Sequence, residues 1–230
     1  MFGKQNKPDG PTVLDFEQAR QRMVHQQIER RGITDDRVLE AMLKVPREEF
    51  VEESARRSAY EDYPLPIGFG QTISQPFTVA FQCEALQLTG DERVLEIGTG
   101  SGYCAAVLSH LANEVYSIER IPELAKVAAA TLERLGLSNV HVVAADGTWG
   151  LPSHAPFDAI LVTAGGRSLP EPLVEQLAPG GRIVIPIGRT LSGQTMFRYT
   201  KLPDEGDKVD CGVALPHTSA TEAARGTALS

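Results

Sequence analysis

Short apolar runs alternate with longer amphipathic runs through the middle of the chain. The apolar runs are rich in Val and Ile and occupy residues 94–97, 115–118, 140–143, 159–162 and 182–187. Such runs predict buried strands. Helical patterns separate them, at residues 103–112, 122–135 and 171–177. This alternation predicts an α/β fold in which a doubly wound, mostly parallel sheet is covered by helices on both faces. Residues 195–199 are a candidate sixth strand.

The N-terminal third has a different pattern and predicts a helical extension. Residues 14–31 are rich in Gln, Glu and Arg and lack Pro and Gly, so we expect a helix that ends at Gly32. We expect Thr34 to cap a second helix that stops before Pro46. Two prolines and two glycines in residues 58–71 predict an irregular segment.

Both ends of the chain are small and polar. Residues 1–12 are expected to form a flexible leader, and residues 218–230 a disordered tail. The leader lacks the apolar stretch of a signal peptide, and no run approaches the length of a membrane span. These features favour a cytoplasmic protein without a membrane partner.

Composition limits the partners and the chemistry. The 230 residues correspond to one domain with an extension. Twenty-two Lys and Arg against 30 Asp and Glu give a net charge of -8, which disfavours binding to nucleic acid. The three cysteines, Cys83, Cys104 and Cys211, are scattered, and no His/Cys spacing indicates a metal site.

A glycine-rich turn follows the first predicted strand of the sheet. Gly98, Gly100 and Gly102 allow a tight turn and let a ligand approach the backbone. Glu119 ends the second strand, 21 residues after Gly98, where an acid suits the hydroxyls of a ribose. The turn therefore indicates a nucleotide-like ligand, the alternative being an ordinary strand–helix turn.

Charge next to the turn favours one kind of nucleotide. The third glycine comes one residue early for the dinucleotide pattern GxGxxG, and Glu96 precedes the turn. A carboxylate repels a pyrophosphate but attracts the ammonium and sulfonium of S-adenosylmethionine. We interpret Glu96 as a cofactor residue, the alternative being a solvated acid at a strand end. Asp146, followed by Gly147, is a candidate acceptor for the adenine amino group, or else a plain Asp-Gly turn.

The segment Thr72-Ile73-Ser74-Gln75-Pro76 comes just before an apolar helix, FTVAFQCEALQL. Val79, Cys83 and Leu86 share one face of that helix and should belong to the core. Ser74 has two interpretations. Its hydroxyl caps the helix, with Pro76 just inside, or it points into the cleft beside the glycine-rich turn.

Three stretches, GQTISQPFTVAFQCEALQL, VLEIGTGSGY and VYSIER, resemble the protein-L-isoaspartate O-methyltransferases. The resemblance runs from about Arg22 to Tyr199. It implies S-adenosylmethionine as cofactor, Ser74 as the active-site residue, and Thr72 and Ile73 in a loop over the cofactor. The cofactor contacts it implies are Glu96, Gly98, Gly100, Gly102, Glu119, Asp146 and Gly147, with no metal.

The resemblance also implies a division of the chain. Residues 1–75 would hold the leader, the helices and the substrate loop, residues 76–200 the cofactor-binding core, and residues 201–230 a divergent C-terminal segment. Two stretches depart from the family. Ala164–Arg167 stands where relatives have an Ala-Ala-Pro-like turn, and Cys211–His217 is short where relatives have a closing strand.

The implied reaction is methyl transfer to the free α-carboxylate of L-isoaspartyl residues in damaged proteins, by an enzyme that acts as a monomer. An α-carboxyl has a pKa of about 3.3–3.7, so it is already a nucleophile at neutral pH and needs no general base. Three alternatives remain open at this point. They are a methyltransferase acting on RNA or a small molecule, a nicotinamide-dependent oxidoreductase, and a binding module without catalysis.

Overall fold

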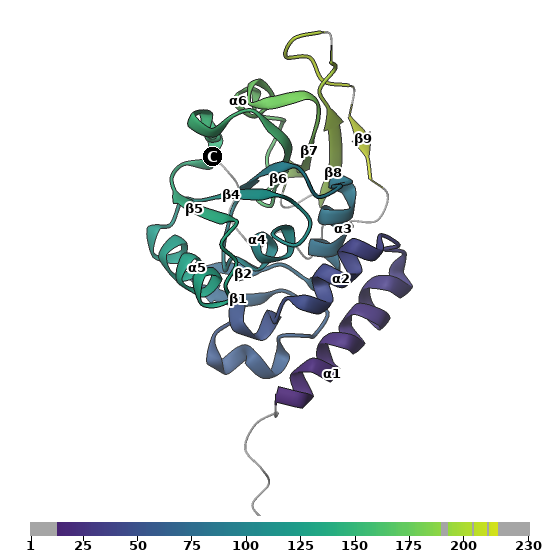
Figure 1. Cartoon of the computed structure of the whole chain (residues 1–230), viewed down its shortest axis with the longest axis vertical. Coiled ribbons are helices and arrows are strands. Elements are labelled where there is room, and N and C mark those ends of the chain that lie inside the picture. The colour runs from purple at the N-terminus through teal and green to yellow at the C-terminus, as the bar shows by residue number, and fades with distance from the viewer. Residues whose placement is uncertain (1–12, 190–192, 204, 211, 216–230) are drawn as a thin grey trace, which may run out of the picture.

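The computed structural model describes residues 13–189, 193–203, 205–210 and 212–215. Within these ranges the chain forms a seven-stranded sheet with the strand order β5-β4-β3-β6-β7-β8-β9 (Figure 1). Strands β3 to β7 are parallel, and β8 and β9 are antiparallel to their neighbours. The predicted doubly wound, mostly parallel sheet is confirmed. No helix in the described ranges is long and apolar enough to cross a membrane.

The sheet contains the five predicted runs and the candidate sixth strand, but β7 begins five residues earlier than predicted and β9 was not predicted. Its strands are β3 Arg93–Ile97, β4 Glu114–Glu119, β5 Val140–Ala144, β6 Phe157–Val162, β7 Leu177–Arg189, β8 Gly193–Thr200 and β9 Val213–Ala214. The helices between them are α4 Tyr103–Leu108, α5 Pro122–Arg134 and α6 Glu171–Glu175. Two 3₁₀ turns, Gly147–Trp149 and Pro152–His154, follow β5.

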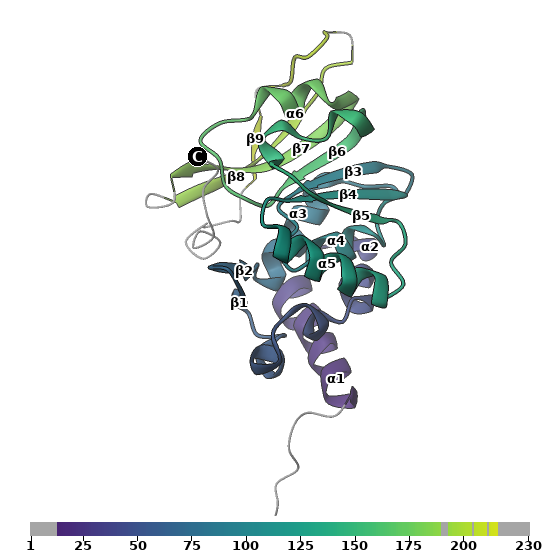
Figure 2. The same cartoon turned by 90° about the vertical axis from the view of Figure 1, so that its left-hand side faces the viewer.

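Both faces of the sheet are buried, but unequally. On one face Val94, Val115 and Leu161 join a large apolar cluster with the N-terminal helices, α3 (Pro76–Leu86), α4 and α5. On the other face Leu95 and Ile160 belong to a smaller cluster that includes residues of α6. Figure 2 shows the sheet between these two layers. Burial of alternate residues on opposite faces explains why the strands read as continuous apolar runs.

The N-terminal extension packs on the thicker layer. It contains α1 Val13–Met23, a π-helical turn Val24–Ile28, a 3₁₀ turn Glu29–Arg31, α2 Asp36–Lys44, and 3₁₀ turns Arg47–Phe50 and Glu53–Ser58. The first helical run ends at Gly32, with φ 102°, as expected. The expected cap at Thr34 is wrong, because Asp35 accepts hydrogen bonds from the backbone of Arg37 and Val38. The Thr34 amide instead donates to Glu84 of α3.

The expectation of an irregular segment at residues 58–71 is wrong in part. β1 Leu65–Gly68 and β2 Gln71–Ile73 form a two-stranded antiparallel hairpin. Its tip has positive φ at Gly68 and Gly70, which glycine allows, and also at the non-glycine residue Phe69, with φ 52°. Pro66 is tolerated because a two-stranded sheet consists of edges. Of the residues expected to break structure, the two glycines are thus the ones that make the turn.

The C-terminal strand is short. β9 pairs with Phe197 and Arg198 of β8, so the described part of the closing stretch contributes Val213 and Ala214 to the sheet. The expected leader 1–12 and tail 218–230 lie outside the described residues, as do Cys211, Pro216 and His217 of the stretch that departs from the family.

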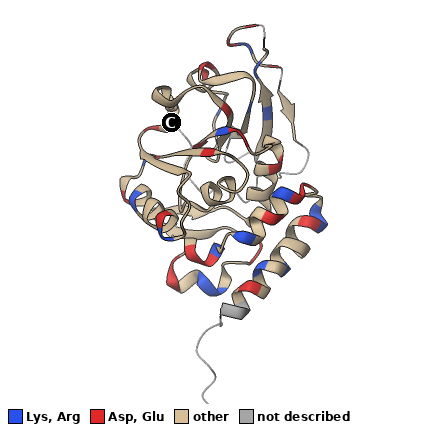
Figure 3. Ribbon diagram, viewed as in Figure 1, with Lys and Arg blue, Asp and Glu red and all other residues tan. Residues whose placement is uncertain are grey.

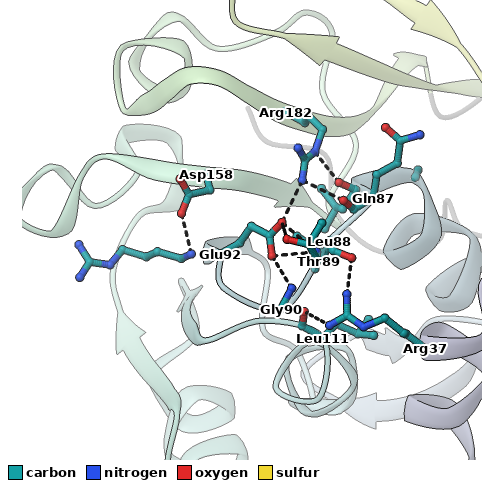
Figure 4. A network of polar contacts seen from close by, with 12 residues as sticks. Arg37, Gln87, Leu88, Thr89, Gly90, Glu92, Leu111, Asp158 and Arg182 are labelled. Carbon is teal, nitrogen blue, oxygen red and sulfur yellow. Dashed lines mark hydrogen bonds and ion pairs between the residues drawn. The ribbon is translucent and has the colours of Figure 1, made fainter.

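Two arginines hold the C-terminal end of α3 (Figure 4). Arg182 of β7 donates to the carbonyls of Leu86 (2.5 Å) and Gln87 (3.1 Å). Arg37 of α2 donates to the carbonyls of Leu88 (2.5 Å) and Leu111 (3.0 Å). Carbonyls at a helix end lack partners inside the helix, and cations near them are favourable. The end of α3 distant from Ser74 is therefore anchored to both the sheet and the N-terminal extension.

Glu92 belongs to the same network of polar contacts at the C-terminal end of α3. Its carboxylate accepts hydrogen bonds from the amides of Thr89 and Gly90 at 2.8–2.9 Å and lies 3.5 Å from Arg182. Burial raises the pKa of Glu92, but hydrogen bonds to the charged form from Gly90 and Thr89 outweigh burial and leave the pKa below its usual value. Ionised Glu92 therefore stabilises the fold at neutral pH.

Glu92→Gln should lower the free energy of unfolding at pH 7 by about 1.5–3 kcal/mol, because it removes hydrogen bonds to a charged group. A folded-state pKa below the unfolded value means that this stabilisation is lost as the pH falls below 4.5. The difference between variant and wild type should shrink over that range in urea unfolding. Glu133→Gln, on the exposed face of α5, is the control. An equal difference at pH 7 and pH 3.5 would contradict this role.

Candidate functional site

A cleft opens at the carboxyl ends of β3, β4 and β6, beneath the segment that joins β2 to α3. It holds about 660 Å³ of empty space, part of it open to solvent. At β3 the strand order reverses, with β4 on one side and β6 on the other, and ligands of open α/β sheets bind at such points. The lining residues are Gln71, Thr72, Ile73, Ser74, Val79, Gly98, Thr99, Gly100, Ser101, Tyr103, Cys104, Glu119, Thr163 and Ala164.

An adjoining hollow of about 440 Å³ extends the cleft toward β5. It shares Gln71, Gly98, Glu119 and Ala164 with the first and reaches Arg120 and Gly147. The cleft therefore spans the ends of four neighbouring strands, β5, β4, β3 and β6, as an elongated nucleoside ligand requires. Among the described residues, no group of three or more His, Cys, Asp or Glu side chains is placed to hold a metal ion.

The glycine-rich turn passes close to its neighbours. Gly98, Gly100 and Gly102 all have positive φ, at 102°, 54° and 89°. A Cβ on Gly98 would lie 2.4 Å from Thr163 Oγ1 at the end of β6. The Gly98 amide donates to Ile118 O at 2.9 Å. The turn is thus held between β4 and β6, with its backbone forming one wall of the cleft.

Glu119 anchors the turn from the end of β4. Glu119 is 6% exposed as a residue, and its carboxylate accepts hydrogen bonds from the amides of Gly100 (2.9 Å) and Ile121 (3.0 Å). It lines both hollows. A carboxylate offers about four acceptor positions, so two bonds leave capacity for hydroxyl donors of a ligand. This geometry fits the predicted contact with a ribose.

Glu96 lies beneath the cleft and does not line it. It is 0% exposed, so a solvated acid is excluded. Its Oε2 accepts from Ser117 Oγ at 2.5 Å, and Ser117 in turn contacts Thr99 of the turn. Oε1 is buried and has no hydrogen-bond partner among the described residues. Burial, with a smaller effect of the charge on Glu119, raises the pKa of Glu96 to about 7, although hydrogen bonds from Ser117 and Cys104 oppose the shift.

Asp146 and Gly147 differ in their position. Asp146 is exposed and caps the following 3₁₀ turn by accepting from the Thr148 amide (2.9 Å) and hydroxyl. These hydrogen bonds, that from the hydroxyl first, lower the pKa of Asp146. Gly147 lines the smaller hollow, and a Cβ there would lie 2.5 Å from Ile97 Cγ2. The turn therefore needs glycine for close packing, and Asp146 is adjacent to the hollow without lining it.

Thr72, Ile73 and Ser74 all line the cleft opposite the glycine-rich turn. Ser74 is half-buried and its carbonyl accepts from Arg47 Nη2 at 2.7 Å. The cap of α3 is Gln75, which makes no side-chain capping bond. Among the described residues no hydrogen bond joins the Ser74 hydroxyl to the helix. The interpretation of Ser74 as a helix cap is therefore wrong, and its place in the cleft wall agrees with the other interpretation.

Sequence reasoning missed several residues of the site. Thr163 directly follows a predicted strand, next to the point where the strand order reverses. Strand topology could therefore have indicated Thr163 as a residue of the cleft. Tyr103 directly follows the turn, and Cys104 looks like ordinary core. The prediction that Val79, Cys83 and Leu86 form a buried face is confirmed. Cys83 and Cys104 are both free and buried.

The comparisons with known proteins agree with one another. The family model described as protein-L-isoaspartate(D-aspartate) O-methyltransferase matches residues 18–215. A protein-L-isoaspartate O-methyltransferase 2 of Marinobacter nauticus is 58% identical over 196 residues, covering 85% of this chain and 88% of the relative. One of the same name from Pelobacter propionicus is 51% identical over 205 residues, covering 88% and 91%.

The similar solved structures carry the same family name. A protein-L-isoaspartate O-methyltransferase superposes with a TM-score of 0.73 at 36% identity, covering 80% of this chain and 60% of that chain. A putative protein-L-isoaspartate O-methyltransferase from Plasmodium falciparum, in complex with S-adenosyl-L-homocysteine, has a TM-score of 0.71 at 26% identity, covering 85% and 94%.

Glu119→Ala should weaken the binding of S-adenosylhomocysteine about tenfold or more, because a hydrogen bond to a charged group contributes about 1.5–3 kcal/mol. Calorimetry measures this directly. Glu114→Ala is the matched control, because Glu114 lies at the other end of β4 and pairs with Arg93 (3.0 Å) away from the cleft. Unchanged affinity in Glu119→Ala would remove Glu119 from the binding site.

Proposed function

The chain belongs to the protein-L-isoaspartate(D-aspartate) O-methyltransferase family, and we propose that its cleft performs the family reaction with Ser74 as the residue that contacts the substrate. The enzyme transfers a methyl group from S-adenosylmethionine to the free α-carboxylate of L-isoaspartyl residues in damaged proteins, which starts their repair. The family decides against the alternatives of an oxidoreductase and a non-catalytic module.

The residues around the cleft fit the cofactor. Glu119 offers acceptors for the ribose, and Gly98, Gly100 and Gly147 let a ligand approach the backbone. Glu96, buried under the turn, does not touch the ligand, and its carboxylate acts on a cationic cofactor only through its charge. We propose that these residues hold the cofactor with Thr72, Ile73 and Gly102. Asp146, just outside the smaller hollow, reaches the adenine amino group.

The bound cofactor supplies an electrophilic methyl group on a sulfonium. The chain's own task is to place the substrate carboxylate in line with that group and to exclude water. The Ser74 hydroxyl, half-buried in the cleft wall, donates a hydrogen bond to the carboxylate. The amides at the start of α3, beyond Gln75, stabilise its negative charge. Because the carboxylate is already ionised at neutral pH, no residue has to remove a proton.

We propose that the chain is divided into the three parts that the sequence implies. Residues 1–75 supply the substrate and cofactor loop, residues 76–200 the cofactor-binding core, and residues 201–230 a C-terminal segment. Isoaspartyl proteins and peptides are the substrates of a cytoplasmic monomer, and nucleic acid is not. The net charge of -8 disfavours nucleic acid as a substrate, and so does the mixing of Lys and Arg with Asp and Glu along the N-terminal helices (Figure 3).

The single observation that carries the proposal is the position of Ser74 in the wall of a cleft shared with the glycine-rich turn and Glu119. The direct test is methyl transfer from labelled S-adenosylmethionine to an isoaspartyl peptide and to its aspartyl twin. The enzyme should methylate the first and leave the second unmodified. Equal methylation of the twins, or methylation of RNA alone, would refute the proposal.

Ser74→Ala should lower kcat/KM for the isoaspartyl peptide about 10- to 150-fold, since it removes one hydrogen bond to the reacting carboxylate. The melting temperature should stay near that of the wild type, because the hydroxyl caps no helix. Some activity should remain, as Ser74 is not the nucleophile. Ser109→Ala, which removes a buried hydroxyl at the far end of α4, is the control. Wild-type turnover in Ser74→Ala would contradict the role.

A further inference from the structure

Arg47 is the largest side chain that is fully buried in the described residues, with 0% exposure. It lies in the 3₁₀ turn Arg47–Phe50 after α2, in the N-terminal extension. Fully buried arginines are rare unless they are paired with an acid. The contacts of Arg47 therefore bear on its role.

Its guanidinium joins three segments that are distant in the sequence. Nε donates to Ala59 O and Nη2 to Ser74 O, both at 2.7 Å. The guanidinium carbon lies 4.7 Å from the centre of the Tyr103 ring. Ser74 and Tyr103 line the cleft from opposite walls, one from the substrate segment and the other from the start of α4. Arg47 thus sits directly behind the proposed substrate site.

The charge of Arg47 is not neutralised within the described residues. None of their carboxylates lies within ion-pair distance of the guanidinium. The adjacent Glu48 accepts a hydrogen bond from the Tyr60 hydroxyl instead. Arg47 Nη1 is buried without a hydrogen-bond partner. Burial lowers the pKa of Arg47, while the Tyr103 and Tyr60 side chains oppose the shift.

An unpaired buried cation lowers the stability of the fold, which indicates that Arg47 has a role other than stabilisation. A positive charge behind Ser74 attracts an anion that enters the cleft, and it does so strongly because the surroundings exclude water. The anion that the proposed reaction brings to Ser74 is the α-carboxylate of the isoaspartyl residue.

We propose that Arg47 is a positioning residue for methyl transfer: it holds Ser74 through the Ser74 carbonyl, and its uncompensated charge favours the substrate's carboxylate over a neutral group at the same place. This inference rests on the function proposed above. Arg47 then has two separable roles. The geometric part is to hold the Ser74 segment through hydrogen bonds to two backbone carbonyls, and the electrostatic part is to attract the substrate's carboxylate through its charge.

The electrostatic part is tested by the binding of two peptides to the enzyme saturated with S-adenosylhomocysteine. One peptide carries the isoaspartyl α-carboxylate, and its twin carries an α-carboxamide there. Calorimetry gives the ratio of the two dissociation constants for wild type, Arg47→Met and Arg47→Gln. The preference for the carboxylate should fall about tenfold in both neutral variants. A merely structural role would weaken both peptides equally and leave the ratio unchanged, which would overturn the proposal.

The geometric part is tested by Arg47→Lys, which keeps the charge but cannot reach both carbonyls. The carboxylate preference should stay within about threefold of wild type, while kcat for the isoaspartyl peptide should fall about tenfold. A lower melting temperature with wild-type kcat would refute the geometric part of the proposal. This variant decides the geometric question even if the neutral variants do not fold.

Arg37 provides the matched control. It also donates to two backbone carbonyls, those of Leu88 and Leu111, but at the far end of α3 and α4. Arg37→Met should lower the melting temperature and leave both the carboxylate preference and kcat at wild-type values. If the wild type methylates isoaspartyl peptides and the Arg47 variants keep its preference and kcat, the inference fails and the proposed function stands. If the wild type methylates none, the function itself fails.

Discussion

The close passage of the Gly98 backbone against Thr163 sets the geometry of the whole site. No side chain fits there, since a Cβ would lie 2.4 Å from the threonine oxygen. Because the Gly98 backbone lies so close to Thr163, the turn after β3 runs between the ends of β4 and β6, where the strand order reverses. Glu119 then reaches the Gly100 amide from β4. A cleft with a wall of backbone amides and one buried carboxylate follows from that contact.

Arginines hold both ends of α3, and the opposite wall of the cleft depends on the one at the N-terminal end. Arg182 and Arg37 bind the carbonyls at its C-terminal end (Figure 4), while Arg47 binds the carbonyl of Ser74 just before its N-terminal end. Two of these arginines come from the N-terminal extension. The extension therefore does more than cover the sheet, because it places Ser74 across the cleft from the glycine-rich turn.

The parts of this structure that sequence could predict are those determined by local pattern. The strands were predictable because burial on both faces makes them continuous apolar runs, and the turn because its glycines follow a strand directly. The hairpin 65–73 was missed because Pro66 and Gly70 also break structure in other settings. Arg47 was missed because it stands beside two acids and looks solvated. Its partners, Ala59 and Ser74, are 12 and 27 residues away and meet it only in the folded chain.

The central claim is that Ser74 receives the substrate's carboxylate opposite the cofactor turn. The most direct measurement is a crystal structure of the enzyme with S-adenosylhomocysteine and an isoaspartyl peptide. One carboxylate oxygen should lie within about 2.6–3.2 Å of the Ser74 hydroxyl, the other should face the sulfur, and Arg47 should still donate to the Ser74 carbonyl. A carboxylate bound away from the segment Thr72–Pro76, with Ser74 contacting only the protein, would contradict the claim.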